Sequence, residues 1–218
     1  MARVDHKKIR QLIAQKQKTV TDRQFFSSRA FAAYFADMAL AQTRRYGYHR
    51  RVKVRTAWEP KNGNTAMTNN ELIWLNAGHP SITQHKSRAE RYAQLCGLFA
   101  HELGHVLYTD FITSQTHLTR LDSGFWYPEP PPLRTSREQH AEEELWDYSG
   151  DSRKHQSMVR FIMHDIMNIL EDGYIEQRMI AEYPGVLGQN LRVGQVPLLI
   201  CLRSRRSSRM SRSRDMSG

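Results

Sequence analysis

The sequence predicts one α+β domain, mainly helical, with a small antiparallel sheet. Two observations predict this class: long stretches repeat apolar residues at helical spacing, and two short strand-like segments lie between the first two of them. The chain has 218 residues, 39% of them hydrophobic, which is enough for one sizeable core. We expect this domain at residues 23–188, after a basic segment at 1–22 and before an Arg/Ser-rich tail at 189–218 whose composition predicts disorder.

The first half of the chain supplies one helix and both strands. Residues 22–46 repeat apolar and aromatic side chains at helical spacing, which predicts a packed helix. Residues 51–58 alternate basic and apolar side chains, and residues 71–76 are typical of a second strand. Because turn residues at 61–64 lie between the two, we expect an antiparallel pair, with 71–76 as the edge strand along which a peptide lies.

A long helix is expected after the sheet, which should pack on it. Ser87 is a suitable N-cap, and apolar residues recur at helical spacing from 88 to 108. The last turns of this helix contain the run His101-Glu102-Leu103-Gly104-His105.

The second half is expected to form a loop and two helices. Residues 110–134 should be irregular, because the proline-rich run at 128–132 cannot be helical, and a loop of this length would be a lid or cleft wall. Ser136 and Gln139 have the form of a capping box that opens an acidic helix to about residue 148. A strongly apolar helix at 158–182 follows and stops before Pro184.

Charge and cysteine content limit the class of protein. The net charge is +10, but residues 1–23 and 203–218 each carry five excess positive charges, so the segment between them is balanced. The basic ends can hold nucleic acid nonspecifically, or they are simply solvated ends. Cys96 and Cys201 lie far apart, and no apolar run reaches the roughly 18 residues of a membrane span. We therefore expect a cytoplasmic protein with no membrane segment and no disulfide framework.

The five-residue run is the strongest chemical signal in the sequence. Two histidines four apart on a helix share one face and lie about 6 Å apart along the axis, so His101 and His105 can bind one zinc ion. Glu102 is rotated by about 100° and can hold a metal-bound water, the place for a general base. Since zinc lowers the pKa of that water to about 7, Glu102 can take its proton and pass it to a leaving amine.

The last predicted helix offers the third zinc ligand. His164, Asn168 and Glu171 form a polar stripe through a helix otherwise rich in apolar residues, and a buried carboxylate needs a partner. We predict Glu171 as the ligand, with Asp172 as its main rival and Glu176 as a weaker one. A purely structural reading remains for both helices: the two histidines are polar positions beside a core stripe, and Asp172 or Glu176 pairs with Arg178.

Two segments together resemble a known family. Residues 98–111 (LFAHELGHVLYTDF), followed by 168–176 (NILEDGYIE), are similar to the metallopeptidase-like region of bacterial and phage proteins that often carry a von Willebrand factor A domain, a group that includes relatives of a cobaltochelatase subunit. The similarity covers about residues 25–183. It implies a zincin-like fold in which the glutamate of the second segment, Glu171, completes the zinc site.

The chain departs from that family after the second segment. Relatives continue into a von Willebrand factor A domain with an Asp-x-Ser-x-Ser run, and this sequence has none. A partner of the von Willebrand factor A type is therefore an expectation from the resemblance alone, as is the view that the chain is a fragment of a larger protein. The first hypothesis is a zinc metallopeptidase acting on peptides or proteins. The alternative is a zinc-bearing scaffold or partner-binding module with weak catalysis.

Overall fold

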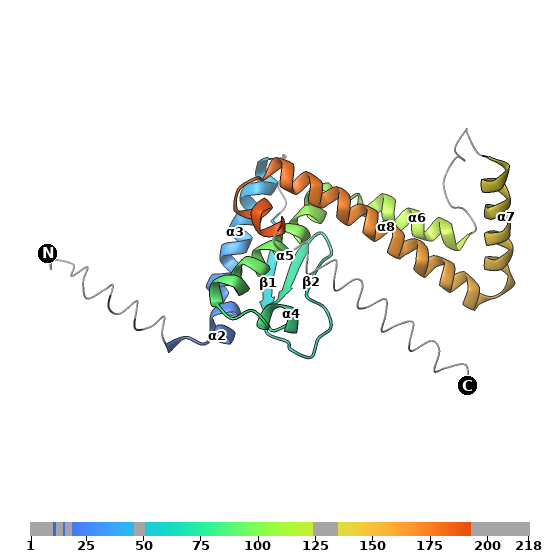
Figure 1. Cartoon of the computed structure of the whole chain (residues 1–218). Coiled ribbons are helices and arrows are strands. Elements are labelled where there is room, and N and C mark those ends of the chain that lie inside the picture. The colour runs from blue at the N-terminus through green and yellow to red at the C-terminus, as the bar shows by residue number, and fades with distance from the viewer. Residues whose placement is uncertain (1–10, 12–14, 16–18, 46–50, 124–134, 193–218) are drawn as a thin grey trace. The chain divides into compact units, whose positions relative to one another are not determined.

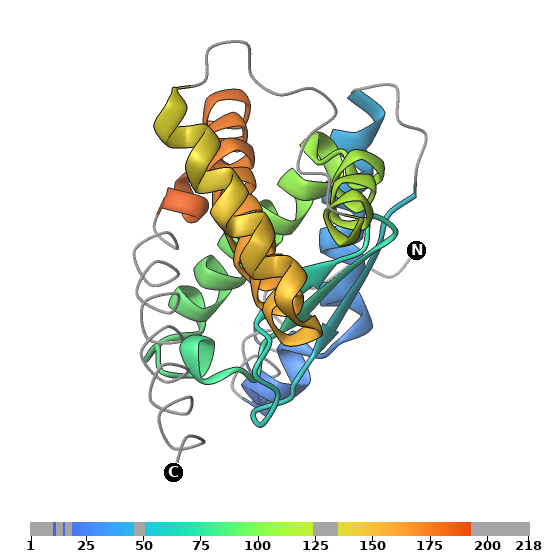
Figure 2. The ribbon, with the colours of Figure 1, turned by 90° about the vertical axis from the view of Figure 1, so that its right-hand side faces the viewer.

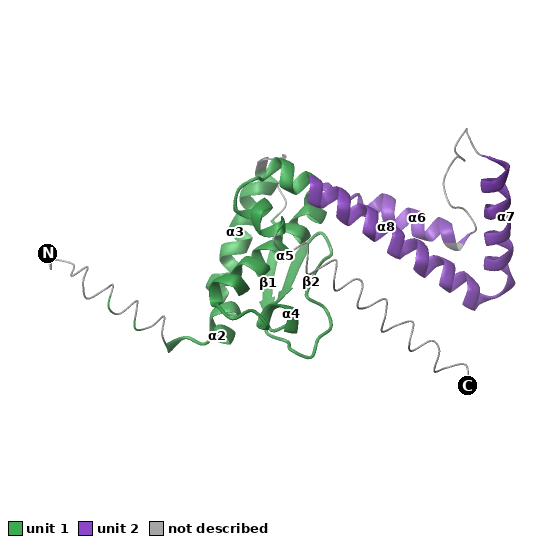
Figure 3. Ribbon diagram, in the orientation of Figure 1, with its two compact units in different colours: residues 1–107, 178–218 green, residues 108–177 purple. Residues whose placement is uncertain are grey.

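A computed structural model describes residues 19–45, 51–123 and 135–192, together with Gln11 and Gln15 (Figure 1). The chain divides into two compact units, Met1–Leu107 with Arg178–Gly218, and Tyr108–Gln177 (Figure 3). Helices and one small three-stranded sheet make up the described secondary structure, which confirms the α+β class. Among the described helices, none is both long enough and apolar enough to cross a membrane.

Unit 1 begins with two helices where the sequence predicted one. Helix α2 spans Asp22–Phe26 and helix α3 spans Arg29–Arg45. The chain breaks at Ser27 and Ser28 because the Ser28 hydroxyl accepts a hydrogen bond from the Phe31 amide at 3.1 Å and so caps a new helix. The predicted basic segment before α2 lies mostly outside the described residues.

The sheet contains both predicted strands but not in the predicted arrangement. Strands β1 (Lys53–Ala57), β2 (Ala66–Thr68) and β3 (Leu72–Asn76) lie in the order β1-β3-β2. Strand β3 is parallel to β1 and antiparallel to β2, so the predicted antiparallel pair was wrong, and so was the placement of residues 71–76 at the edge. The hairpin joins β2 and β3 instead, where Asn70 adopts a φ of 72° in the turn. Helix α3 packs beside β1, as the two ribbon views show (Figures 1 and 2).

Asn76 holds the end of β3 to the loops around it. This side chain is fully buried, and its amide nitrogen donates hydrogen bonds to the carbonyls of Glu59 and Asn64 at 2.8 and 3.1 Å. Its amide oxygen accepts from the backbone amides of Glu59 and Gly78. All of these partners are backbone groups that would otherwise need hydrogen bonds to water. One buried polar residue therefore fixes the loop that follows β3. This loop leads through helix α4 (Pro80–Thr83) towards α5.

Helix α5 spans Arg88–Tyr108, as the sequence predicted. Ser87 and Glu90 form reciprocal capping hydrogen bonds of 3.1 and 3.0 Å at its start. Phe99 packs against Phe35 of α3 with ring centroids 4.6 Å apart. A second neighbour is the helical segment at 186–192: a Cβ atom at Gly97 would lie only 2.7 Å from the Asn190 carbonyl oxygen. That segment crosses the predicted boundary at residue 188.

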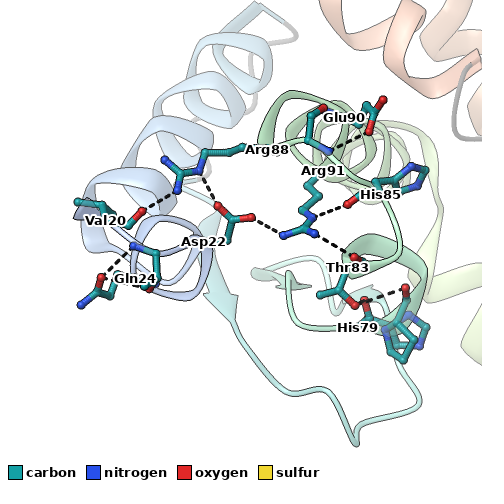
Figure 4. Close-up of polar contacts among 12 residues, drawn as sticks. Val20, Asp22, Gln24, His79, Thr83, His85, Arg88, Glu90 and Arg91 are labelled. Atoms are coloured by element: carbon teal, nitrogen blue, oxygen red, sulfur yellow. Dashed lines mark hydrogen bonds and ion pairs between the residues drawn. The ribbon is translucent and has the colours of Figure 1, made fainter. Parts of the chain in front are cut away.

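An ion-pair cluster ties the start of α5 to α2 (Figure 4). The Asp22 carboxylate accepts from Arg88 Nε at 2.6 Å and also pairs with Arg91. Arg91 in turn donates to the carbonyls of His85 and Thr83 at 2.8 and 3.1 Å, and Arg88 donates to the Val20 carbonyl. The carboxylate thus connects α2 to α5, and Arg91 extends the cluster to residues 83–85.

Unit 2 contains helices α6 (Phe111–Asp122) and α7 (Ser136–Asp151) and most of α8 (Arg153–Glu182). The prediction of an irregular segment was wrong for residues 111–122, which form α6. Asp110 caps this helix, because its carboxylate accepts hydrogen bonds from the Thr113 hydroxyl and amide. The same bonds hold the pKa of Asp110 below its usual value. The proline-rich run lies outside the described residues. The cap of α7 is Thr135 with Glu138, one residue earlier than predicted. Helix α8 ends where expected but begins five residues earlier than the predicted start at 158.

We expect Gly97→Ala to lower the stability of unit 1. The new methyl group would collide with the Asn190 carbonyl, and overpacking of this kind costs about 1–3 kcal/mol. Gly150→Ala is the matched control, because Gly150 is also helical but a methyl group there would meet no neighbouring atom within 4 Å, so this change should leave stability unchanged or raise it by up to about 1 kcal/mol. Urea unfolding followed by circular dichroism measures both; equal midpoints would contradict the close packing of 186–192 on α5.

Replacing Asp22 with Asn should loosen the start of α5. The carboxylate is partly buried and accepts from two guanidinium groups, so its loss should cost about 1 kcal/mol in the free energy of unfolding. Asp37→Asn, on the neighbouring helix, is the control for removing one negative charge. Salt titration of the unfolding midpoint checks the cause: the difference between the two variants should shrink as salt screens the pair.

Candidate metal centre

Helix α5 is enclosed along its second half except on the side of the two histidines. From Leu95 to Leu107 every residue is buried apart from His101, His105 and Val106. The apolar stripe of Leu95, Phe99 and Leu103 faces the core, while the two histidines lie more than 100° around the helix from Phe99. The helix therefore holds both imidazoles on a rigid, packed element and leaves them half-buried.

The two imidazoles point towards a common position. Their Nε2 atoms lie 3.3 Å apart, with ring centroids at 4.9 Å and ring planes at 80° to each other. At this distance one ring can donate a hydrogen bond to the other. The same spacing suits a shared metal, because two nitrogens at about 2.0–2.1 Å from a zinc ion, at the tetrahedral angle, lie about 3.3 Å apart.

Glu102 is the one carboxylate among the buried polar side chains of the described residues. Only 7% of its surface is exposed, although it lies next to a half-buried histidine. Burial of an ionisable group is costly unless other groups or a metal offset it, and such groups gather at functional sites. Around the helix, Glu102 lies between His101 and the core stripe.

The structure groups one carboxylate with the histidine pair. Within the described chain, His101, His105 and Asp172 each offer a ligand atom, and these atoms all lie within 4.8 Å of one another. Asp172 belongs to α8, six residues before the helix enters unit 1 at Arg178. Glu171, the predicted ligand, is half-buried but is not in this group, and neither is Glu176.

The polar residues His164 and Asn168 of α8 lie on an exposed face and not among packed apolar residues, as the sequence had suggested. His164 Nδ1 and Asn168 Nδ2 lie 3.0 Å apart, on an exposed face. The apolar residues around them were expected to pack, which was the reason for seeking a partner for each charge. Phe161, Ile162, Ile166, Ile169 and Leu170 are instead all exposed. Because His164 and Asn168 are exposed, burial gives them no need of a partner. The argument for a third metal ligand on α8 therefore rests on Glu171 and Asp172 alone.

Sequence reasoning missed two groups on α5 whose ionisation is perturbed. Burial raises the pKa of the Cys96 thiol, and burial together with hydrogen bonding to Cys96 and Tyr34 raises the pKa of the Tyr92 hydroxyl. Tyr92 and Cys96 lie four residues apart on α5, within the range whose helical spacing predicted this helix. Both groups stay protonated near neutral pH and contribute packing on the side of α5 that faces Tyr34.

Comparisons with known proteins leave the geometry as the basis for any functional conclusion. No protein-family model, no curated protein sequence and no solved structure matches this chain.

Proposed function

We propose that this chain is a zinc-dependent metallopeptidase of the cytoplasm, related to the metallopeptidase-like family that its two motifs resemble. The observation that carries the proposal is the convergence of His101 Nε2 and His105 Nε2 at 3.3 Å, with a carboxylate of α8 in the same group of ligand atoms. The free, buried thiol of Cys96 is compatible with a reducing compartment.

The chemistry of this donor set suits zinc. Two imidazole nitrogens and one carboxylate oxygen form the ligand set of many catalytic zinc sites, which keep a fourth position open for water or substrate. Structural zinc sites are usually closed by four ligands, often including cysteine thiolates. The group found here has three members and no cysteine, which supports a catalytic role over a purely structural one.

The third ligand is a carboxylate of the pair Glu171 and Asp172. Adjacent residues on a helix point about 100° apart, so only one of the two can lie in the site at a time. The family resemblance favours Glu171, whereas the distances favour Asp172. We take Asp172 as the ligand that the distances support and keep Glu171 as the competing prediction.

Zinc bound there would act as a Lewis acid towards a peptide carbonyl and lower the pKa of a coordinated water to about 7. The protein's part in the reaction falls to Glu102. Its carboxylate takes a proton from the attacking water and delivers it to the nitrogen of the leaving amine. The burial of Glu102 strengthens its interactions with the charges that develop, because few water molecules can screen them.

Peptides are the substrate class that follows from this chemistry. An extended peptide can add to the edge of a sheet through backbone hydrogen bonds, and β2 lies at an edge of the sheet in unit 1. Its residue Met67 is half exposed there. The binding strand expected from the sequence is thus replaced by β2, because β3 is paired on both sides.

Metal analysis should find about one zinc ion per chain in the purified protein and should separate the two carboxylates. His101→Ala and His105→Ala should lose the zinc, because each removes one of two converging nitrogens. Asp172→Ala should lose it as well, while Glu171→Ala should keep it. His140→Ala, which changes an exposed histidine of α7, controls for adventitious binding. A reversed result for the two carboxylates would make Glu171 the ligand, and a zinc-free wild type would end the proposal.

Glu102→Gln should separate metal binding from catalysis. The amide keeps the size of the side chain but cannot accept a proton, so we expect full zinc content with cleavage of peptide mixtures slowed by roughly 10²–10⁴-fold. Glu143→Gln, at an exposed position of α7, should cleave at the wild-type rate. Equal cleavage by both variants would show that a group other than Glu102 moves the proton; zinc without any cleavage by the wild type would favour a scaffold role.

A further inference from the structure

Strand β2 is bonded to the sheet along one side only. The flanking residues Thr65 and Asn69 form backbone hydrogen bonds with β3, at 2.8 and 3.3 Å. Residues that face the partner strand alternate in an antiparallel pair, so Met67 also faces β3, while the backbone groups of Ala66 and Thr68 point away from it. Among the described residues, none makes a hydrogen bond to the backbone N–H or C=O groups of these two. The outer side of β2 therefore offers two donors and two acceptors to a further strand.

These backbone groups fit an extended chain, because the unpaired edge of a sheet is a template for another strand. The described part of unit 2 does not offer one, since α6, α7 and α8 are helices whose backbone groups bond within each helix. The segment at 124–134, outside the described residues, contains four prolines, which lack the N–H that a strand donates. A peptide substrate, which the proposed reaction requires, supplies both the donors and the acceptors that the edge needs.

One exposed apolar side chain lies on this edge. Met67 is 50% exposed, and its cross-strand neighbour Trp74 is 7% exposed. Because side chains alternate between the two faces of a sheet, Thr65 and Asn69 lie on the same face as Met67, one before it and one after it. A strand added beside β2 would therefore meet a single apolar group between two polar ones on that face.

We propose that Met67 determines substrate specificity: the peptide adds antiparallel to β2 and places a large apolar side chain against Met67. This inference rests on the proposed function, because it takes the bound peptide to be the substrate. Antiparallel pairing is the slightly more stable arrangement per residue. The peptide residue opposite Met67 then belongs to a pair without mutual hydrogen bonds, in which side chains come closest, and its two neighbours bond to Ala66 and Thr68.

The chemistry of the methionine side chain sets the preference. Contact with an apolar residue removes the exposed surface of Met67 from water, which is favourable, whereas a charged residue would lose water and gain no partner. A flexible thioether adapts to apolar side chains of different shape, so we expect a class of large apolar residues and not one amino acid. The sheet lies beside α5, the helix that carries His101 and His105, in both ribbon views (Figures 1 and 2).

Cleavage of a peptide library by the zinc-loaded full chain tests the proposal. The wild type should prefer a large apolar residue at one fixed position from the cleaved bond, by roughly tenfold in kcat/KM over serine there. Met67→Lys should lose this preference and favour an acidic residue at the same position, because opposite charges attract across neighbouring strands. Met158→Lys is the matched control: Met158 is a methionine of α8 that is 54% exposed, and this variant should keep the wild-type preference. All three proteins should contain the same amount of zinc.

N-methylation of a cleaved peptide tests the backbone pairing. A methyl group on either neighbour of the apolar residue removes an N–H that bonds to β2 and should lower kcat/KM by about tenfold. Methylation of the apolar residue itself should have little effect, because its N–H points away from β2.

Two results would overturn this inference and leave the proposed function standing. The first is an equal effect of methylation at all three positions, as expected if a second copy or a terminal segment of this chain holds the edge. The second is an apolar preference that survives in Met67→Lys. A zinc-free wild type would instead remove the proposed function, and this inference with it.

Discussion

Helix α5 is packed from several sides at once, with His101 and His105 half-buried, and the rest of unit 1 is arranged around it. Phe35 of α3 meets it on one side and the carbonyl of Asn190 reaches Gly97 on another. The capping bonds of Ser87 and the cluster around Asp22 fix its first turn. A helix held in this way keeps its side chains in defined positions, as the proposed zinc site would require of two nitrogens that lie 3.3 Å apart.

The sequence predicts those elements whose signals are local. The bounds of α5 follow from one cap and one apolar period, and both were visible. The pairing of the strands was wrong because β2 has three residues, too few to show alternation, and its presence reverses the direction in which β3 meets β1. Helix α6 was missed because the proline-rich run further on dominated the interpretation, although Asp110 and Thr113 supply an ordinary cap.

The two helices that carry the candidate site also differ in how well the sequence predicts them. His101, Glu102 and His105 lie within one helix, so their spacing alone predicts that the two histidines share one face. Their Nε2 atoms lie 3.3 Å apart in the structure. The proposed third ligand lies on a different helix. Helical periodicity places Glu171 and Asp172 next to each other but does not say which one is the ligand. The sequence also did not predict that one face of α8 is exposed, because a helix rich in apolar residues is normally interpreted as a buried helix.

The strand order β1-β3-β2 also bears on how the chain reaches its native state. The β2–β3 hairpin joins neighbours through the short turn at Asn70 and can form within microseconds. The parallel pairing of β1 with β3 joins residues nineteen positions apart, from Lys53↔Leu72 to Ala57↔Asn76, and must wait for a loop to close. We therefore expect the β2–β3 hairpin to form before β1 pairs with β3.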